Sequence, residues 1–558
     1  MALSGDLKER LARLRANIEP RVAGLAGAGP AFVLFLSFTD LTRRAITVTA
    51  TGDNFDIAWN GVTARLWEHL VRERIRPCWL RVDWVEQAEE ITWRILKQRL
   101  TSTKRNYFRY GLSLDRCFAN AFLEGELNAN AMLYGGPGIE HAVVNEANFA
   151  RYARLRHGLE HLDFSDDRPI IQFSAKGAFM EESGAVHWLA GAGPDASRRI
   201  IERLQPADIR GLIERGSHYL ATQVGSDGRF TYGWHPCFDR EIRAYNALRH
   251  ASTLYAMLEA WEVTRDPSLF DAIDRGLSHL TEHLIRTVDL GDEKLAVLVE
   301  ANGEIKLGGN AVCLLALCKH AELTGSMRYH SLLERLALAV CRMQDSSTGR
   351  FDHVLTYPGL AVKEPFRIIY YDGEAAFGLM RLYALTRDPR WLAAVERAFD
   401  YFLAHDHWRA HDHWLAYATN ELTRHRPRRD YYEFGLRNFA DHLDFVRHRI
   451  TTFPTLLELM MAARQMLDRL AGDPAHAELL ARIDPTAFHE ALEHRAHYLL
   501  NGHFWPELAM FYANPRRIAG SFFIRHHAFR VRIDDVEHYL SGLVAYLNYR
   551  EGARQPPL

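Results

Sequence analysis

The sequence contains no uninterrupted apolar stretch of about 18 residues, so it predicts no transmembrane helix. It also lacks an excess of charge of either sign, because 68 lysines and arginines stand against 70 aspartates and glutamates. That balance gives no support for a nucleic-acid-binding or other polyanion-binding protein. The absence of a GxxxxGKS/T phosphate loop argues against nucleotide-driven chemistry.

Cysteine is scarce, with six in 558 residues and no CxxC pair. Cys313, Cys318 and Cys341 lie within apolar helical patterns, which favours buried free thiols and a reducing compartment. The charged, amphipathic N-terminus has no apolar core of a secretory signal, so we expect a cytoplasmic protein. Histidine is plentiful at 28, with 12 tryptophans and 22 tyrosines, and this composition suits polar ligand pockets.

The length favours two domains, although large helical toroids exceed the usual domain size. Residues 1–29 read as one amphipathic helix and a Gly/Ala/Pro linker. Residues 30–195 mix strand-like and helical patterns and predict a separate α/β domain. Its expected strands are 32–36, 45–49, 78–85, 106–112, 170–173 and 185–189, and its expected helices are 56–72 and 118–133.

From about residue 205 the strand signals nearly vanish and helical patterns follow one another. They predict twelve helices, or six hairpins: 207–223, 243–264, 267–285, 309–324, 327–345, 372–386, 389–404, 412–423, 430–447, 453–471, 485–500 and 534–549. The helices opening at 243, 309, 372 and 453 are rich in small and apolar residues, whereas their partners are amphipathic. An inner ring buried on all sides and an outer ring exposed on one side would produce this contrast.

A repeat within this region gives three polar residues one shared position. Three helical patterns end at Thr264, Thr324 and Thr386, and the spacing between these threonines also carries His250 onto Asn310 and Asn310 onto Asp372. In a closed ring of hairpins, these residues would lie on one rim.

Six hairpins with Thr-Gly-Asp-Pro-like turns resemble the (α/α)6 toroid superfamily. Its members include the six-hairpin glycosidases, polysaccharide lyases, N-acylglucosamine 2-epimerases and the helical domain of glucuronyl C5-epimerases. The resemblance covers residues 205–550. It implies a mainly α fold with a central cleft, in which loops entering the inner helices line the mouth. The turns occur in most families of this fold, so the resemblance assigns no single family and no single activity.

The candidate residues cluster at the starts of the predicted inner helices. The candidates for catalysis are Asp372, Glu374, Asp535, His538 and His250. The candidates for substrate binding are Arg243, Tyr245, Asn246, Arg249, Asn310, Tyr371, His413, Trp414, Tyr417, Glu421 and Arg532. Ordinary structural roles compete with each of these, notably helix capping by the aspartates and a tight turn at Gly308-Gly309.

Two chemistries fit these residue types, and the sequence leaves both open. Glycoside hydrolysis needs two carboxylates, which Asp372 or Glu374 facing Asp534 or Asp535 would supply. An epimerase or lyase needs an acid and a base beside an acidic carbon, for which His250, Tyr371 and His538 are candidates. Arginines 243, 249 and 532 suit the carboxylate of a uronic acid. We therefore expect a carbohydrate-active enzyme with a saccharide substrate.

The remaining expectations concern metals, partners and other classes of function. His411-Asp412-His413 contains zinc-ligand types but no i, i+4 histidine pair, so no metal and no cofactor is expected. The alternative is a non-catalytic glycan-binding or peptide-binding protein of polysaccharide biosynthesis. A terpenoid-cyclase or lanthionine-cyclase toroid lacks support, because the DxDD motif and the Cys/Cys/His set are absent. For the α/β domain we leave three roles open, namely covering the cleft, binding a partner and forming a homo-oligomer.

Overall fold

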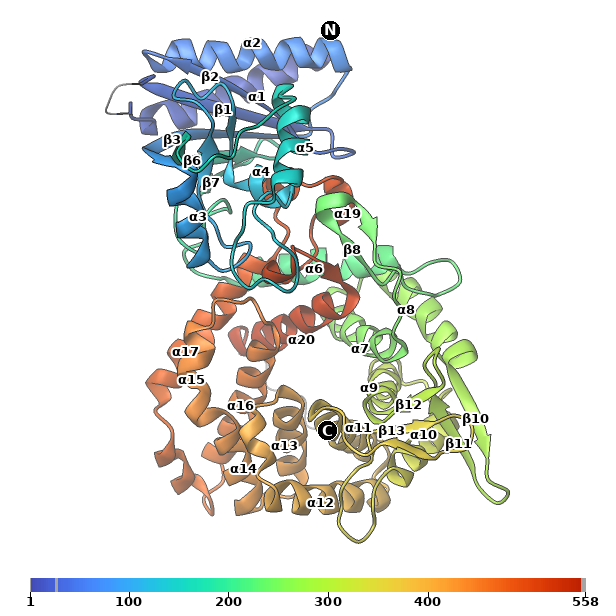
Figure 1. Ribbon diagram of the computed structural model, residues 1–558. Helices are drawn as coiled ribbons and strands as arrows, with labels where there is room; N and C mark the ends of the chain where they lie inside the picture. The colour runs from blue at the N-terminus through green and yellow to red at the C-terminus, as the bar shows by residue number, and fades with distance from the viewer. Residues whose placement is uncertain (1, 26–28, 553–558) are drawn as a thin grey trace. The chain divides into compact units, whose positions relative to one another are not determined.

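The computed structural model describes residues 2–25 and 29–552 (Figure 1). Residues 26–28, which belong to the predicted Gly/Ala/Pro linker, lie outside the described residues. The chain forms two compact units. The first consists of Met1–Glu202, Trp234–Glu241 and Asn501–Val531, and the second of Arg203–Gly233, Ile242–Leu500 and Arg532–Leu558.

The first unit contains the N-terminal helix, which the sequence predicted as a separate segment with its linker. Leu7, Leu11, Leu14 and Ile18 of α1 (Ala2–Ile18) are buried in the same core cluster as strand residues of this unit. The amphipathic pattern therefore marks a helix packed on a sheet.

The segment Asn501–Val531 also belongs to the first unit, although the predicted toroid range of 205–550 included it. Its helices α18 (Pro506–Ala509) and α19 (Pro515–Ile518) are too short to form a ring hairpin. Its backbone is bonded within the first unit, because Ala45 N donates to Met510 O at 2.7 Å.

An antiparallel sheet forms the centre of the first unit, in the order β2-β1-β3-β6-β4-β5, with β7 paired to β6. Leu36 of β1 faces Val48 of β2 on one side and Val82 of β3 on the other. The strands are β1 (Phe32–Thr39), β2 (Ile46–Gly52), β3 (Trp79–Thr92), β4 (Gly111–Ser113), β5 (Ala121–Phe122), β6 (Pro169–Met180) and β7 (Val186–Leu189). The helices, besides α1, α18 and α19, are α2 (Phe55–Glu73), α3 (Trp93–Thr101), α4 (Glu124–Ala129) and α5 (Glu146–His157).

The structure corrects two predicted elements of this unit. The predicted strand 106–112 shrinks to β4, and the predicted helix 118–133 to α4. Asn106, Phe118 and Ala131 have positive φ values of 66°, 57° and 52°. These left-handed residues interrupt regular structure at both places, and periodicity does not reveal them.

The second unit contains a ring of six inner helices (Figure 1). Each inner helix packs on the next along the chain, and the last packs on the first, which closes the ring. They are α7 (Ala247–Thr264), α9 (Leu307–Thr324), α11 (Tyr370–Thr386), α13 (His413–His425), α16 (Thr455–Ala471) and α20 (Ile533–Arg550). The outer helices are α6 (Pro206–Gln223), α8 (Pro267–His279), α10 (His330–Arg342), α12 (Pro389–Ala404), α14 (Arg429–Phe439) and α17 (Pro485–Tyr498), with the short α15 (Leu443–His448) beside α17. The predicted (α/α)6 toroid is thereby confirmed.

Small residues let the inner helices approach one another closely. A Cβ on Gly378 of α11 would lie 2.8 Å from Ala311 O of α9, and one on Gly373 would lie 2.6 Å from Leu415 N of α13. Glycine at these positions therefore permits backbone contacts that any larger side chain would prevent.

The structure adds short strands to a region that the sequence predicted as almost purely helical. The largest pair is the hairpin of β10 (Ile285–Asp289) and β11 (Lys294–Leu298). It follows α8 and a π-helical turn at Leu280–Leu284, which together match the predicted helix 267–285. The others are β8 (Gly233–His235), β9 (Arg240–Glu241), β12 (Glu304–Lys306), β13 (Val354–Thr356), β14 (Val362–Glu364) and β15 (Val531–Arg532). These strands lie in the connections between helices.

The cysteines and the helices agree with two further expectations. All six cysteines are free thiols, and Cys313 and Cys318 are buried in α9. Cys117 is exposed and Cys341 is only partly buried, so burial does not extend to all of them. Among the described residues, no helix has the length and apolar character needed to cross a membrane.

Candidate active site in the helical ring

Ionisable side chains gather in the first two turns of five inner helices. They are Arg249 on α7, Glu374 on α11, His413 on α13, Glu458 on α16, and Asp534, Asp535, Glu537 and His538 on α20. We call these eight residues the rim cluster. All except the half-buried Arg249 are buried. Burying charge is costly unless the groups pair or change protonation state, so such a cluster is a candidate for chemistry.

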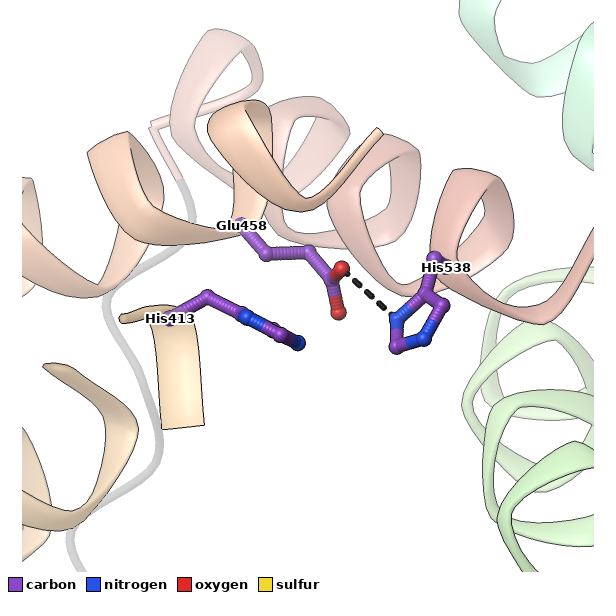
Figure 2. A group of neighbouring side chains, drawn as sticks. All are labelled: His413, Glu458 and His538. Atoms are coloured by element: carbon purple, nitrogen blue, oxygen red, sulfur yellow. Dashed lines mark hydrogen bonds and ion pairs between the residues drawn. The ribbon is translucent and has the colours of Figure 1, made fainter. Parts of the chain in front are cut away.

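Three members of the rim cluster point toward one another from three neighbouring inner helices (Figure 2). Nδ1 of His538 hydrogen-bonds to Oε2 of Glu458 at 2.9 Å. The rings of His413 and His538 lie edge to face with centroids 5.3 Å apart. Nε2 of His413 is buried and has no hydrogen-bond partner among the described residues. This nitrogen is therefore available to a bound molecule.

The environment of Glu458 and His538 disfavours charge on both. Burial raises the pKa of Glu458 to about 7, and burial lowers the pKa of His538 below its usual 6.5. The hydroxyl of Tyr417 donates to Oε1 of Glu458 at 3.3 Å, which fixes the second carboxylate oxygen. The pair therefore shares a proton near neutral pH, as an acid–base group requires.

Two further glutamates of the rim cluster are held close to neutral. Burial raises the pKa of Glu374 to about 8 and that of Glu537 to about 7. The hydroxyl of Ser252 donates to Oε2 of Glu537 at 2.6 Å. Oε2 of Glu374 is buried without a partner among the described residues. At neutral pH, Glu374 is mainly protonated and can act as a proton donor.

Both arginines at this rim are paired with aspartates. Arg532 donates to Oδ1 of Asp535 at 2.9 Å through one nitrogen and to Oδ2 at 3.2 Å through another. The same guanidinium lies 3.0 Å from Asp534, and Nε of Arg249 lies 3.5 Å from Asp534. These ion pairs bring the predicted residues Arg249, Arg532 and Asp535 together. The positive charges of the two arginines are therefore balanced by aspartates of the protein itself.

The three residues that share the repeat position make contacts outside the rim cluster. His250 is fully buried, with Nε2 donating to Gly276 O at 2.9 Å. Asn310 accepts from Leu298 N at 2.8 Å. Asp372 lies 3.2 Å from Nε2 of His353. Each polar side chain thus bonds a neighbouring helix or connection.

Of the other predicted residues near α7 and on α13, Tyr245, Asn246 and Glu421 have structural contacts. The hydroxyl of Tyr245 donates to Nδ1 of His250 at 2.7 Å, and Oδ1 of Asn246 caps α7 by accepting from Arg249 N at 3.2 Å. Arg243 is exposed. Glu421 lies two turns beyond His413 on α13 and pairs with Arg381 at 3.5 Å, so it is separate from the rim cluster.

The predicted aromatic residues pack beside the rim cluster. Trp414 is only 3% exposed and lies against His413, Tyr417 and His538. Burial raises the pKa of Tyr371 to about 12, so it carries a proton at neutral pH. Trp414 and Tyr417 lie against the His413 imidazole and Trp414 also lies against that of His538, whereas the Tyr371 ring lies against His353.

Glu458 and Glu537 of the rim cluster are not among the residues that the sequence predicted for the site. Glu458 stands alone among apolar residues in the stretch Leu456–Ala463, and Glu537 follows Val536 in the last helix. A single carboxylate inside an otherwise apolar stretch is a usable signal, because burying it has a cost that only a specific role offsets.

His413, Glu458 and His538 are also the residues here that could hold a metal ion. Each offers one ligand atom, and these atoms lie within 4.8 Å of one another. Ligands about 2.1 Å from a tetrahedral zinc ion stand about 3.4 Å apart. The His538 and Glu458 atoms are already closer, at the 2.9 Å of a direct hydrogen bond. We therefore interpret the group as an acid–base site.

No protein-family model and no curated protein matches the chain. Solved structures of other proteins do match. Cellobiose 2-epimerase from Bacillus thermoamylovorans B4167 is 10% identical, with a TM-score of 0.48, over 62% of this chain and 99% of that one. The GH76A α-1,6-mannanase from Salegentibacter sp. HEL1_6 is 12% identical, with a TM-score of 0.42, over 61% and 98%. D-mannose isomerase is 11% identical, with a TM-score of 0.46, over 61% and 97%.

Proposed function

We propose that this protein is a carbohydrate-active enzyme that transfers protons at a carbon atom of a neutral saccharide, as epimerases and isomerases do. His538 and His413 form its acid–base pair. The observation that carries the proposal is the hydrogen bond between His538 and Glu458, beside the unpartnered Nε2 of His413. The saccharide class follows from the resemblance of the six-hairpin ring to carbohydrate-active toroids.

The proposed reaction begins with the open-chain form of a reducing sugar. One imidazole removes the proton from the carbon next to the carbonyl, the C–H electron pair forms the C=C bond of an enediolate, and the carbonyl π pair moves onto the carbonyl oxygen. For epimerisation, the other, protonated imidazole returns a proton to the opposite face of the same carbon and the carbonyl re-forms. For isomerisation, the hydroxyl proton first moves from one enediolate oxygen to the other, and the proton is then returned to the neighbouring carbon. Glu458 orients His538 and stabilises its protonated form, as a carboxylate does for a catalytic histidine.

The charges of the rim cluster favour a neutral substrate over the uronic acid that the sequence suggested. Arg249 and Arg532 are paired with Asp534 and Asp535. A substrate carboxylate would have to displace one of these aspartates or stand beside them as a like charge, which is unfavourable. Hydroxyl groups, in contrast, can bond to the protonated Glu374 and to His413.

The test is proton exchange with solvent. The full-length protein is incubated in D2O with a panel of neutral reducing monosaccharides and disaccharides, and deuterium at the carbon next to the carbonyl is followed by NMR and mass spectrometry. We expect exchange with at least one sugar, and a decrease of about 10²-fold or more in His538→Asn and in His413→Asn. His448→Asn is the matched control, because this histidine is exposed. Unchanged exchange in His538→Asn would overturn the proposal.

One observation favours hydrolysis as a second candidate. Oε2 of Glu374 and Oδ1 of Asp534 are both buried without a hydrogen-bond partner among the described residues. A protonated Glu374 and the Asp534 carboxyl, which is paired with Arg249 and Arg532, would supply the acid and the second carboxyl group that glycosidases need. Shortened oligosaccharides without deuterium exchange, lost in Glu374→Gln, would support this reaction. Saccharide binding without either reaction would favour the non-catalytic alternative.

A further inference from the structure

The first unit contains a pocket of about 520 Å³ in which arginines and aromatic rings meet. Arg44, from the turn between β1 and β2, lines it together with Arg151, Tyr152 and Arg154 of α5. Phe238, from the segment Trp234–Glu241 of the same unit, forms another part of the wall. We call it the arginine pocket. Its volume is in the range of small-molecule sites, about 300–1,000 Å³.

The arginine pocket is positive because no carboxylate lines it. Among the described residues, Arg44 hydrogen-bonds only to backbone carbonyls, those of Phe511 at 3.0 Å and Cys237 at 3.2 Å. Arg151 contacts the ring of Phe238, and no carboxylate in the described part of the chain pairs with it. In the part of the chain that the structure describes, Arg154 has one carboxylate partner, Glu160 at 4.0 Å. This contrasts with the rim cluster, where Arg249 and Arg532 are both neutralised by aspartates.

A structural role explains these arginines only in part. Arg154 lies in the last turn of α5, where a cation stabilises the helix dipole. Arg151 lies in the middle of α5 and Arg44 on a different element, so the dipole accounts for neither. Burial lowers the pKa of Arg44, which means that its charge is held at a cost in the absence of a counter-charge.

The aromatic rings hold two of the guanidinium groups in place. The guanidinium carbon of Arg44 lies 5.7 Å from the centre of the Tyr152 ring, and that of Arg151 lies 4.9 Å from the centre of the Phe238 ring. Phe238 is 42% exposed, which is unusual for a phenylalanine. Stacking restricts the orientation of each guanidinium, so less entropy is lost when it donates two parallel hydrogen bonds to an anion.

We propose that the arginine pocket binds a small molecule through its anionic group, a phosphate or a carboxylate, held by Arg44 and Arg151. Phe238 packs against the uncharged part of that molecule. The proposal is independent of the reaction at the rim cluster. It gives the first unit a ligand of its own. From the sequence, three other roles were open for this unit: covering the cleft, binding a partner and forming an oligomer.

The test is calorimetric titration of the full-length protein with three probes: glucose 6-phosphate, glucuronate and uncharged glucose. We expect one of the charged probes to bind and glucose not to bind at this pocket, and the binding to weaken as salt is added. Arg151→Gln is expected to lower the affinity about tenfold, the loss of one charge-assisted hydrogen bond. The ratio between the first two probes distinguishes phosphate from carboxylate.

Arg116→Gln is the matched control, because Arg116 lies in the same unit and the change removes the same charge from a 72% exposed side chain. Arg44→Gln is the second pocket variant, and its thermal unfolding is measured in parallel because Arg44 also bonds the backbone. Arg151 is exposed, so its variant is expected to fold as the wild type does. Equal affinity in Arg151→Gln and Arg116→Gln, or no binding of either charged probe, would overturn the proposal.

Discussion

Glu374 fills a space that Gly308 leaves open. A Cβ on Gly308, in the first turn of α9, would lie 1.8 Å from Oε2 of Glu374 on α11. It would also lie 2.6 Å from the ring of Tyr371. Gly308 therefore determines where the most strongly protonated carboxyl of the rim cluster can stand.

Replacing Gly308 by alanine is expected to destabilise the protein and to move Glu374. Alanine is favoured over glycine inside a helix by about 1 kcal/mol, so intrinsic propensity predicts the opposite sign. The overlap with Glu374 should outweigh this gain and leave a net loss of about 1–3 kcal/mol, the usual cost of overpacking. Urea unfolding of the two proteins measures the difference.

Gly309→Ala is the control for this substitution. Its Cβ would come closest to the Cδ2 methyl of Leu298, at 3.0 Å, and its next neighbours are at the ordinary contact distances of 3.6 and 3.7 Å. The end of a flexible side chain can move by the few tenths of an ångström needed. If Gly308→Ala is as stable as Gly309→Ala, then Glu374 has more room than the structure gives it.

The sequence favoured a tight turn at Gly308-Gly309 and left the close approach of a ligand or another helix as the alternative. The structure places both glycines inside α9, and the group that approaches Gly308 is the side chain of Glu374. Which of the three alternatives holds depends on the packing of α9 against α11, which a single sequence does not contain.

The helices of the ring could be predicted because their burial pattern is local. The alternation of apolar helices with amphipathic ones follows from the two rings, and each hairpin repeats it. The direction in which a single side chain points from its helix is harder to predict from the sequence. Asp372 and Glu374 are two residues apart and therefore differ by about 200° around the helix. This rotation sends Asp372 to His353 and Glu374 to the rim cluster.

His250 is expected to be a structural residue. It is fully buried, burial lowers its pKa to about 3, and its neutral ring links Tyr245 to the carbonyl of Gly276. His250→Ala should lose about 2–4 kcal/mol through the cavity and the two broken hydrogen bonds. Thermal unfolding measures this loss, and the rate of deuterium exchange per folded molecule should stay within a few-fold of wild type. A large drop in that rate with unchanged stability would return His250 to the catalytic candidates.

The buried glutamates should make the stability of the protein decrease as the pH rises. The folded-state pKa of Glu374 is about 8, above the 4.5 of an exposed glutamate. Between these two pKa values Glu374 is protonated in the folded protein and ionised in the unfolded chain. Its contribution to the free energy of unfolding is therefore fully present below the unfolded-state pKa and decreases as the pH rises to the folded-state pKa. Glu374→Gln removes this proton linkage. Its unfolding temperature, followed from pH 5 to pH 9, should change less than that of wild type, and the variant should gain most at the alkaline end.

The same measurement on Glu262→Gln provides the comparison, because Glu262 is a 38% exposed glutamate of the same ring. Its curve should run parallel to that of wild type. A Glu374→Gln curve that is also parallel to wild type would mean that Glu374 is ionised across this range, and with it the general-acid role would be lost.

Removal of metal ions should leave the activity unchanged. His538 Nδ1 and Glu458 Oε2 are hydrogen-bonded at 2.9 Å, closer than two ligands of one tetrahedral zinc ion. Elemental analysis of the purified protein should therefore find much less than one zinc ion per chain, and dialysis against a chelator should not slow deuterium exchange.

The variant Glu458→Gln distinguishes an orienting carboxylate from a metal ligand. As an orienting carboxylate, its loss should lower the exchange rate and shift the pH profile of that rate without changing metal content. As a metal ligand, its loss should lower metal content and activity together, and added zinc should restore both.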